Sequence, residues 1–386
     1  MLNRETSGAS ETTDAIIIGG GVIGLAIARS LRLQGLQSVT LIERGRPGME
    51  ASHAAAGMLA PQVEADGADA FLELACRSRD SYPDFAAALF EETGIDIELE
   101  RTGTLLLSFS DEDEAEALRR YEWQSRAGLS VEQLTNEEAR ELEPCLSPLV
   151  RSALRFPRDW QVENRRLVAA LAASADKLGV RLLTNTSAES VLTERGRVTG
   201  VETSRGRLSA GVVVIAGGAW ASLLTTTDKR APAVSIEPVR GQMLCFAATT
   251  RPARHVIYSP RGYLVPRLDG RLLCGSTTER VGYEKSVTGY GLQTIMAQAL
   301  EIAPVVSRLP LADCWAGLRP RAADDWPVLG MSAELEGLCY AAGHYRNGIL
   351  LAPLTGELIA ERITGADCSS KLDAFSPDRF QLAGVG

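Results

Sequence analysis

Three glycines near the N-terminus have the spacing of a phosphate-binding turn. Gly19, Gly21 and Gly24 form a G-x-G-x-x-G pattern directly after the apolar run DAIII. The first glycine permits a tight turn, the second lets the backbone approach a pyrophosphate at a helix N-terminus, and the third allows close helix packing. Glu43 ends the next apolar run, where it can bind both hydroxyls of a ribose. The pattern predicts dinucleotide binding, and the acid favours NAD or FAD over NADP.

The elements that must position this turn form a βαβ unit. We expect a strand over 14–18, a helix over 22–33 that ends at Gly35, and a second strand over 38–43. Further helices are predicted at 71–94, 163–178, 288–302 and 349–363, with buried strands at 212–218 and 338–342. The region 236–318 is rich in short alternating segments, which indicates a mostly antiparallel sheet.

This arrangement predicts an α/β protein with a Rossmann-like FAD-binding domain and a second, substrate-binding domain on a mostly antiparallel sheet. We assign 14–75, 155–225 and 320–366 to the first domain and 76–154 and 226–319 to the second, with tails at 1–13 and 367–386. Within the second domain, Ser110 precedes four acidic residues, which we interpret as a helix N-cap followed by carboxylates on the helix dipole.

Two segments, one of small residues and one rich in glycine, favour FAD over NAD. Residues 52–61 (SHAAAGMLAP) are small and suited to a backbone laid against a flat ligand. Residues 341–356 (AAGHYRNGILLAPLTG) supply a second turn from strand to helix, whose N-terminus can face an electron-rich ring. Two separated cradles predict a long cofactor such as extended FAD.

Composition excludes several other classes. The 386 residues carry a net charge of −9, which argues against a general affinity for nucleic acid or anionic lipid. Seven scattered cysteines without a CxxC pair are expected to be reduced thiols, and the three histidines give no zinc pattern, so no metal site is predicted. The N-terminus has no apolar signal region and no apolar run reaches the ~18 residues of a membrane span. We therefore expect a cytoplasmic protein.

Several motifs together resemble the D-amino-acid oxidase superfamily of flavoproteins, and within it most closely the bacterial glycine oxidases of thiamine biosynthesis. These motifs are IIIGGGVIGLAIA, SHAAAGMLAP, VVVIAGGAWAS, RGYLVPR, CWAGLRP and GHYRNGILLAPLTGELIA, which extend over almost the whole chain. The resemblance implies noncovalent FAD and oxidation of a small amino acid to an imino acid that water hydrolyses. No protein residue is assigned as catalytic, because the flavin carries the chemistry.

The resemblance also assigns the substrate site. Arg319 of WAGLRP matches an arginine that binds the substrate carboxylate, and a guanidinium suits this role because it donates two parallel hydrogen bonds. Tyr263 matches a tyrosine that binds the same carboxylate, Arg346 an arginine near flavin and substrate, and Met58 a position that lines the site. Ala188 matches the position whose backbone meets the adenine.

The turns and the resemblance together predict the cofactor-binding residues. For His344 we favour a structural role near the flavin over a catalytic one. The complete set is Gly19, Gly21, Val22, Ile23, Gly24, Glu43, Arg44, Ser52, Ala56, Gly57, Met58, Ala188, Gly217, His344, Arg346, Asn347, Gly348 and Ile349.

Two residues depart from the relatives. Arg261 stands where glycine oxidases carry a histidine near the pocket mouth, which leaves the substrate open. Cys314 falls close to the cysteine that holds the flavin covalently in sarcosine oxidases, and we interpret it as a buried small hydrophobic residue.

The predicted reaction is oxidative deamination of glycine or another small amine, with glyoxylate formed from glycine and with ammonia and hydrogen peroxide as the other products. Oxygen is the expected electron acceptor, and a homo-oligomer is compatible with the sequence. A D-amino-acid or proline dehydrogenase that reduces a quinone stays open, as does a non-catalytic dinucleotide-binding protein. An RNA-modifying flavoprotein is disfavoured by the acidic charge balance.

Overall fold

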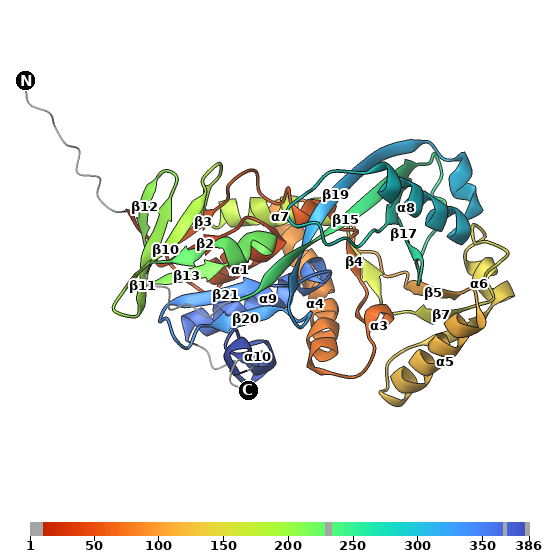
Figure 1. The fold of residues 1–386 in the computed structure, drawn as a ribbon, viewed down its shortest axis with the longest axis horizontal. Helices are drawn as coiled ribbons and strands as arrows, with labels where there is room; N and C mark the ends of the chain where they lie inside the picture. Colours follow the sequence, from red (N-terminus) through yellow and green to blue (C-terminus); the bar gives the residue numbers. More distant parts are fainter. Residues whose placement is uncertain (1–10, 228–233, 366–368, 383–386) are drawn as a thin grey trace, which may run out of the picture.

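The computed structural model describes residues 11–227, 234–365 and 369–382. Figure 1 shows two portions side by side, one containing β2, β13, β21 and the helices α1 and α9, and the other containing β5, β7, β17 and α8. The two longest strands, β15 and β19, extend from the second portion toward the first.

The first portion is built on a six-stranded sheet with the order β20, β21, β13, β2, β3, β9. Neighbouring strands are parallel except for the edge strand β20, which is antiparallel to β21. Continuous apolar runs such as AIII and VVVI form the central strands because both faces of this sheet are covered. The strands are β2 (Ala15–Ile18), β3 (Val39–Ile42), β9 (Arg181–Leu183), β13 (Val212–Ile215), β20 (Val328–Met331) and β21 (Leu338–Ala342).

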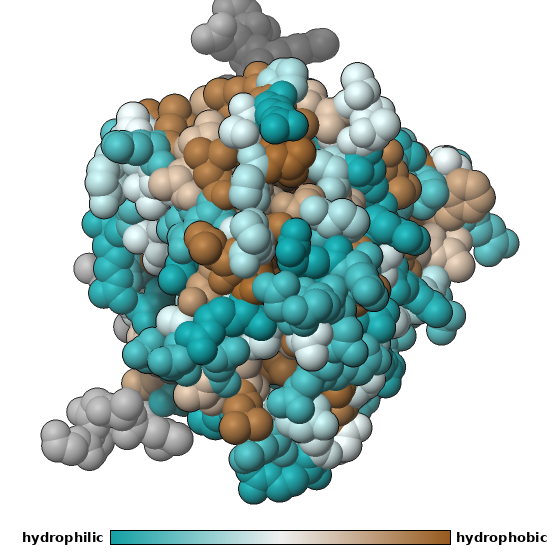
Figure 2. Space-filling view, turned by 90° about the vertical axis from the view of Figure 1, so that its right-hand side faces the viewer, coloured by the Kyte–Doolittle hydropathy of each residue, from teal (hydrophilic) through white to brown (hydrophobic). Residues whose placement is uncertain are grey.

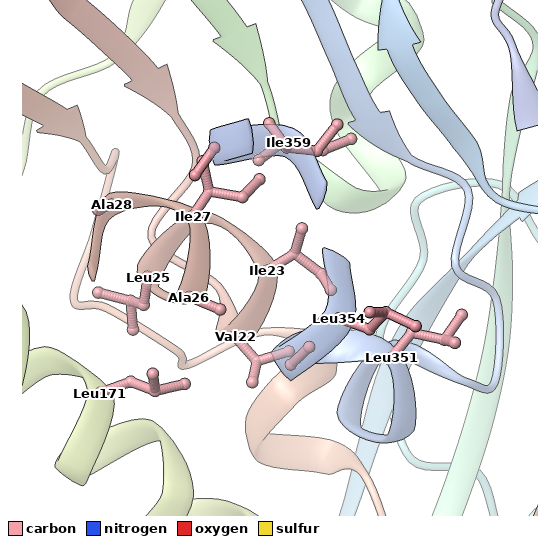
Figure 3. Packing of buried hydrophobic residues seen from close by; sticks show 14 of the residues in the cluster. Val22, Ile23, Leu25, Ala26, Ile27, Ala28, Leu171, Leu351, Leu354 and Ile359 are labelled. Atoms are coloured by element: carbon pink, nitrogen blue, oxygen red, sulfur yellow. The ribbon is translucent and has the colours of Figure 1, made fainter. Parts of the chain in front are cut away.

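Alternate residues of β2 face different layers, as the pleat of a strand requires. Ala15 and Ile17 belong to one core, which is formed with the helices α1 (Val22–Leu33), α4 (Ala70–Thr93), α7 (Asn164–Lys177) and α9 (Gly348–Thr364). Figure 3 shows Leu351, Leu354 and Ile359 of α9 on one side of α1 and Leu171 of α7 on the other.

Ile16 and Ile18 of β2 belong to a second core on the opposite face of the sheet. A five-stranded sheet covers that face, with the order β1, β12, β11, β10, β14. Its strands are β1 (Glu11–Thr12), β10 (Ala188–Glu194), β11 (Arg197–Thr203), β12 (Gly206–Ser209) and β14 (Thr225–Thr226).

The second portion is built on an eight-stranded sheet with the order β19, β15, β18, β17, β16, β5, β7, β6. All neighbours are antiparallel except β16 and β5, so the predicted mostly antiparallel sheet is confirmed. The strands are β5 (Thr104–Ser108), β6 (Glu132–Thr135), β7 (Ser152–Phe156), β15 (Ile236–Ala247), β16 (Val256–Ser259), β17 (Gly262–Pro266), β18 (Arg271–Gly275) and β19 (Leu311–Ala322).

Helices α5 (Asp111–Arg126), α6 (Asn136–Leu142) and α8 (Gly289–Ile302) lie at this end of the molecule. The Oγ of Ser110 accepts a 3.2 Å hydrogen bond from the Asp113 N–H, so the predicted N-cap of α5 is confirmed. Figure 2 views this end and shows hydrophobic residues interspersed with hydrophilic ones.

The remaining elements are short. They are α2 (Ala51–Ala54), β4 (Met58–Leu59), α3 (Pro61–Glu64), β8 (Trp160–Gln161), η1 (Gly218–Leu223), η2 (Pro304–Arg308), α10 (Ser369–Leu372), η3 (Asp373–Phe375) and α11 (Arg379–Leu382). None of the helices in the described residues is long and apolar enough to cross a membrane.

The domain boundary predicted between residues 75 and 76 falls inside α4. Leu74 and Leu89, on either side of that boundary, both pack in the core formed with α1, α7 and α9. The predicted tails lie partly outside the described residues, while Leu372 and Phe375 pack in the same core. The division into two discontinuous domains stays a prediction.

Candidate active site

The glycine-rich turn has the geometry that its spacing predicts. Gly19 has a φ of +114°, and a Cβ there would lie 2.4 Å from the carbonyl oxygen of Ala216. A Cβ on Gly24 would lie 1.9 Å from the Gly19 carbonyl oxygen, so this glycine is required by packing. A Cβ on Gly21, in contrast, would meet only Ser52 Oγ, at 3.4 Å. Gly21 therefore leaves a space that the protein itself does not fill, at the N-terminus of α1.

A cavity of about 330 Å³ opens beside this turn, and we call it the nucleotide cavity. Both oxygens of the Glu43 carboxylate accept backbone hydrogen bonds, from Gly20 and from Gly45, each at 2.8 Å. Arg44 lies 3.6 Å from the ring centroid of Trp220 at the same cavity. Among the predicted residues, those that line it are Gly19, Gly21, Glu43, Arg44, Ser52, Ala188 and Gly217.

A second cavity of about 140 Å³, the inner cavity, lies on the other side of Gly21. It shares Gly21, Ala51, Ser52, Ala216 and Gly218 with the nucleotide cavity, so the two form one elongated cradle. The predicted residues that line it are Gly21, Val22, Ile23, Ser52, Ala56, Gly57, Met58, Tyr263, Arg319, His344, Arg346, Gly348 and Ile349.

Arg319 lies on β19, opposite the neighbouring strand β15. Its guanidinium rests against Gly241, where a Cβ would lie 2.2 Å from Nη2. Nη2 donates a 2.7 Å hydrogen bond to Ser276 Oγ, and Nη1 donates a 3.1 Å bond to the carbonyl of Thr277. No carboxylate of the described residues forms an ion pair with it. The inner cavity therefore contains a cation whose charge the surrounding side chains do not balance.

Tyr263 lies on β17 and is 7% exposed. Its hydroxyl lies 3.3 Å from Met243 Sδ, and its ring stacks on Tyr258 with centroids 6.2 Å apart. Because a thioether is a weak acceptor, this hydroxyl keeps most of its capacity for a ligand oxygen. Arg319 and Tyr263 thus bring polar groups to one cavity from two strands of the sheet.

The loop between β21 and α9 carries Arg346 to the edge of the inner cavity. Its Nη2 donates a 2.8 Å hydrogen bond to Glu64 Oε1 and a 3.0 Å bond to the hydroxyl of Tyr258. The Glu64 carboxylate raises the pKa of the Arg346 guanidinium above its usual value. Asn347, predicted to contact the cofactor, lines a neighbouring cavity together with Arg346.

His344 is buried beneath this loop. Its Nε2 lies 3.2 Å from Thr355 Oγ1 of α9, and burial lowers the pKa of the imidazole to about 3. The side chain is therefore neutral at physiological pH, in keeping with the structural role predicted for it.

Arg267 fixes the small-residue segment that carries Met58. Its Nη2 donates hydrogen bonds to the Ala56 carbonyl at 2.7 Å and to Asn164 Oδ1 at 3.1 Å, and Nη1 donates one to the Val162 carbonyl at 2.8 Å. Burial lowers the pKa of this guanidinium to about 10, so it stays charged at neutral pH. A buried arginine just after β17 thus holds the wall of the inner cavity in place.

The two departures from the relatives lie away from the inner cavity. Arg261 forms ion pairs with Glu301 at 2.9 Å and Asp113 at 3.2 Å, and lines neither cavity described above. On β19, Gly317 and Arg319 line the inner cavity, whereas Cys314 packs with the hydrophobic cluster that includes Ile295 of α8. Side chains alternate between the faces of a strand, so the Cys314 thiol points away from the site.

Sequence reasoning missed several residues of the site. Gly241, Met243 and Glu64 line the inner cavity, and Ser276 holds Arg319. Gly241 carried a signal, because a glycine inside a strand marks a close approach by another group. The partners Glu64 and Ser276 had none, since a lone Glu or Ser is common in any sequence.

The cradle fits an FAD molecule. It is elongated, and the space beside Gly21 at the N-terminus of α1 is left open by the protein. The Glu43 carboxylate lies at one end of the cradle, and Arg319 and Tyr263 line the other end. Residues 14–362 match the family described as FAD dependent oxidoreductase (DAO). The chain belongs to this family.

Relatives of this DAO family member include the bifunctional protein ThiO/ThiG of Synechocystis, with 37% identity over 96% of the chain and 54% of that protein. The chain thus spans about half the length of this relative. The glycine oxidase of Pseudomonas putida is 35% identical over 91% of the chain and 94% of that protein.

A crystal structure of glycine oxidase from Geobacillus kaustophilus superimposes on this chain with a TM-score of 0.92. The two sequences are 35% identical, and the superposition covers 96% of this chain and 99% of the glycine oxidase chain. The predicted fold class and resemblance are confirmed. The chain is an FAD-dependent oxidoreductase, and FAD is its cofactor.

Proposed function

We propose that this oxidoreductase oxidises glycine or a similarly small amino acid, with release of the 2-oxo acid (glyoxylate from glycine), ammonia and hydrogen peroxide. The observation that carries the proposal is the unbalanced guanidinium of Arg319 in the inner cavity, with the Tyr263 hydroxyl lining the same space. The likeness to two glycine oxidases supports the choice of substrate.

Arg319 would bind the substrate carboxylate. A guanidinium and a carboxylate form two parallel, charge-assisted hydrogen bonds, and burial strengthens them. Ser276 and Gly241 restrict the guanidinium on two sides, so its orientation is set before a substrate arrives. The Tyr263 hydroxyl is available to the same carboxylate, because Met243 Sδ is its weak partner in the structure.

FAD, when bound, supplies the acceptor for the two electrons and the hydrogen that leave the substrate α-carbon. The side chains of the inner cavity hold that carbon in place and exclude water. Glu64 is paired with Arg346 and the His344 Nε2 lies within hydrogen-bonding distance of Thr355, so this proposal assigns neither of them as the base. The substrate amine would therefore enter in its neutral form.

The remaining predictions belong to this proposal. The likeness to the protein named ThiO/ThiG supports the predicted place in thiamine biosynthesis. Oxygen as the electron acceptor, a cytoplasmic location and an oligomeric assembly stay predictions. Binding of FAD without catalysis is disfavoured by the polar groups that converge on the inner cavity.

A panel of small amines tests the proposal in two steps. Glycine, sarcosine, the enantiomers of alanine and of proline, and a control without amine are mixed with the holoprotein in the absence of oxygen, and bleaching of the flavin spectrum is recorded. Air is then admitted and peroxide is measured. We expect bleaching by glycine and stoichiometric peroxide. Bleaching by D- or L-proline alone would overturn the choice of glycine as substrate. Reoxidation by a quinone but not by oxygen would assign the chain to a dehydrogenase.

A further inference from the structure

Glu64, Tyr345 and Arg346 form a wall between the inner cavity and a larger neighbouring one. The neighbouring space, which we call the outer cavity, has a volume of about 590 Å³. These three residues line both cavities. A ligand group that extends from the inner cavity toward the outer cavity therefore meets this wall.

The wall contains a guanidinium whose charge is already balanced. Arg346 Nη2 lies 2.8 Å from Glu64 Oε1, with side chains that are 31% and 20% exposed. The hydroxyl of Tyr258 joins the pair, at 3.0 Å from Arg346 Nη2 and 3.5 Å from Glu64 Oε1. Burial raises the pKa of this phenol to about 12, so the hydroxyl stays protonated and adds no charge.

The two arginines of the inner cavity thus differ in one respect. Arg319 donates only to neutral oxygens, whereas Arg346 donates to a carboxylate. A ligand carboxylate gains a full charge-assisted interaction at Arg319, but at Arg346 it must displace Glu64 or lie beside it. The cavity therefore has two guanidinium groups and the electrostatic capacity for one ligand carboxylate.

We propose that Glu64 is a specificity-determining residue that restricts the inner cavity to ligands with one carboxylate, by occupying Arg346. This inference rests on the proposed function, in which Arg319 binds the carboxylate of a small amino acid. Glu64 acts through Arg346 and is a positioning residue. It belongs to α3, the turn of helix that Asp159 fixes through the backbone N–H groups of Gln62 and Val63.

The rim of the outer cavity supplies a matched comparison. Glu116 lines that cavity and pairs with Arg119 and Arg120, but it does not touch Arg346. Glu116→Gln and Glu64→Gln therefore remove the same charge from neighbouring positions. A general change in the field would appear in both variants, whereas release of Arg346 would appear only in Glu64→Gln.

The experiment measures binding of acetate, malonate, succinate and glutarate to the oxidised holoprotein by titration calorimetry. The three dicarboxylates cover different spans between the arginines. In Glu64→Gln we expect the ratio of the acetate Kd to the best dicarboxylate Kd to rise about tenfold or more, as one charge-assisted hydrogen bond allows. Glu116→Gln should keep the ratio of the parent, as should Tyr258→Phe, which retains the ion pair.

Two further variants separate this role from a structural one. Adding Arg346→Gln to Glu64→Gln should abolish the gain in dicarboxylate affinity. Arg346→Gln alone leaves the Glu64 charge unpaired, and should weaken malonate more than acetate even if Glu64→Gln fails to fold. An unchanged ratio in Glu64→Gln, loss of both ligands, or an equal change in Glu116→Gln would overturn the proposal.

Turnover then distinguishes this inference from the proposed function. Glycine and iminodiacetate, which carries a second carboxylate, are compared as substrates of the parent and of Glu64→Gln. If no small amine reduces the flavin of the parent, the proposed function fails, while the calorimetric ratios still test Glu64. If glycine is oxidised and the ratios do not move, only the assignment of Glu64 is wrong.

Discussion

The carboxylate of Glu43 and the backbone N–H of Gly20 are joined by a hydrogen bond of 2.8 Å. This bond links the end of β3 to the glycine-rich turn, and a second bond from Gly45 holds the other carboxylate oxygen. Each oxygen keeps a further lone pair, which our prediction assigns to the ribose hydroxyls of FAD. Glu43 therefore stabilises the glycine-rich turn and also lines the nucleotide cavity.

Glu43→Ala should weaken FAD binding by about 1.5–3 kcal/mol, the range for hydrogen bonds to a charged group. The Kd is measured by titration of the apoprotein with FAD. Glu50→Ala is the control, because Glu50 lines the same cavity and pairs with Arg44 and Lys285 at its edge. Equal affinity of Glu43→Ala and the parent would show that Glu43 does not hold the ribose.

Arg319→Lys should lower kcat/KM for glycine roughly 10- to 150-fold, because lysine keeps the charge but loses at least one of two charge-assisted hydrogen bonds. Part of the loss should appear in kcat, since the carboxylate also orients the α-carbon. The flavin spectrum should be retained. The control is Arg321→Lys on the same strand, whose guanidinium pairs with Asp325. Full activity of Arg319→Lys would make Arg346 the next candidate anchor.

Acid or heat should release the flavin from the polypeptide. Cys314 is the residue that falls close to the flavin-linked cysteine of sarcosine oxidases. It lies on the face of β19 that packs with the cluster containing Ile295, opposite the face of Arg319. The test is absorbance at flavin wavelengths in the supernatant after acid precipitation, for the parent and for Cys314→Ala. Flavin that stays with the parent pellet and is lost on Cys314→Ala would show a covalent bond.

Tyr82→Phe should destabilise the fold by about 1–3 kcal/mol, the cost of a buried polar group left without its partner. Pro353 inside α9 has no N–H, so the carbonyl of Ile349 lacks its helical donor, and the buried Tyr82 hydroxyl donates to it instead. Denaturant unfolding of the holoprotein measures the effect. Tyr290→Phe, at a side chain that is 79% exposed, should leave the free energy of unfolding unchanged.

The buried imidazole of His344 should make the protein sensitive to acid. Its pKa is lowered to about 3 by burial, whereas the unfolded chain protonates near 6.5, so the unfolded state binds more protons between these values. This contribution to stability is complete above pH 6.5 and is lost as the pH falls toward 3. From pH 7 to 5 the free energy of unfolding of the parent should fall by about 2 kcal/mol more than that of His344→Gln. Parallel curves would contradict the assignment.

The βαβ unit could be predicted almost to the residue. The helix expected over 22–33 is α1. The strand expected over 14–18 is β2, which begins one residue later at Ala15. Both follow from local properties, namely the apolar period and the glycines that permit the turn. Arg319 and Tyr263 were found through motifs that cover a few neighbouring residues each, and the structure brings both to the inner cavity.

The sequence by itself determined the segments, the kind of cofactor and the cation expected to hold a carboxylate. Only the tertiary structure decided which of the two arginines, Arg319 or Arg346, is paired with a carboxylate of the protein. Glu64 and Arg346 are 282 residues apart, and Ser276 meets Arg319 because β15, β18 and β19 pair in one register. Charge balance depends on distances between atoms, and these distances arise only when distant segments pack together. Arg346 therefore has a carboxylate partner, whereas Arg319 has none among the described residues.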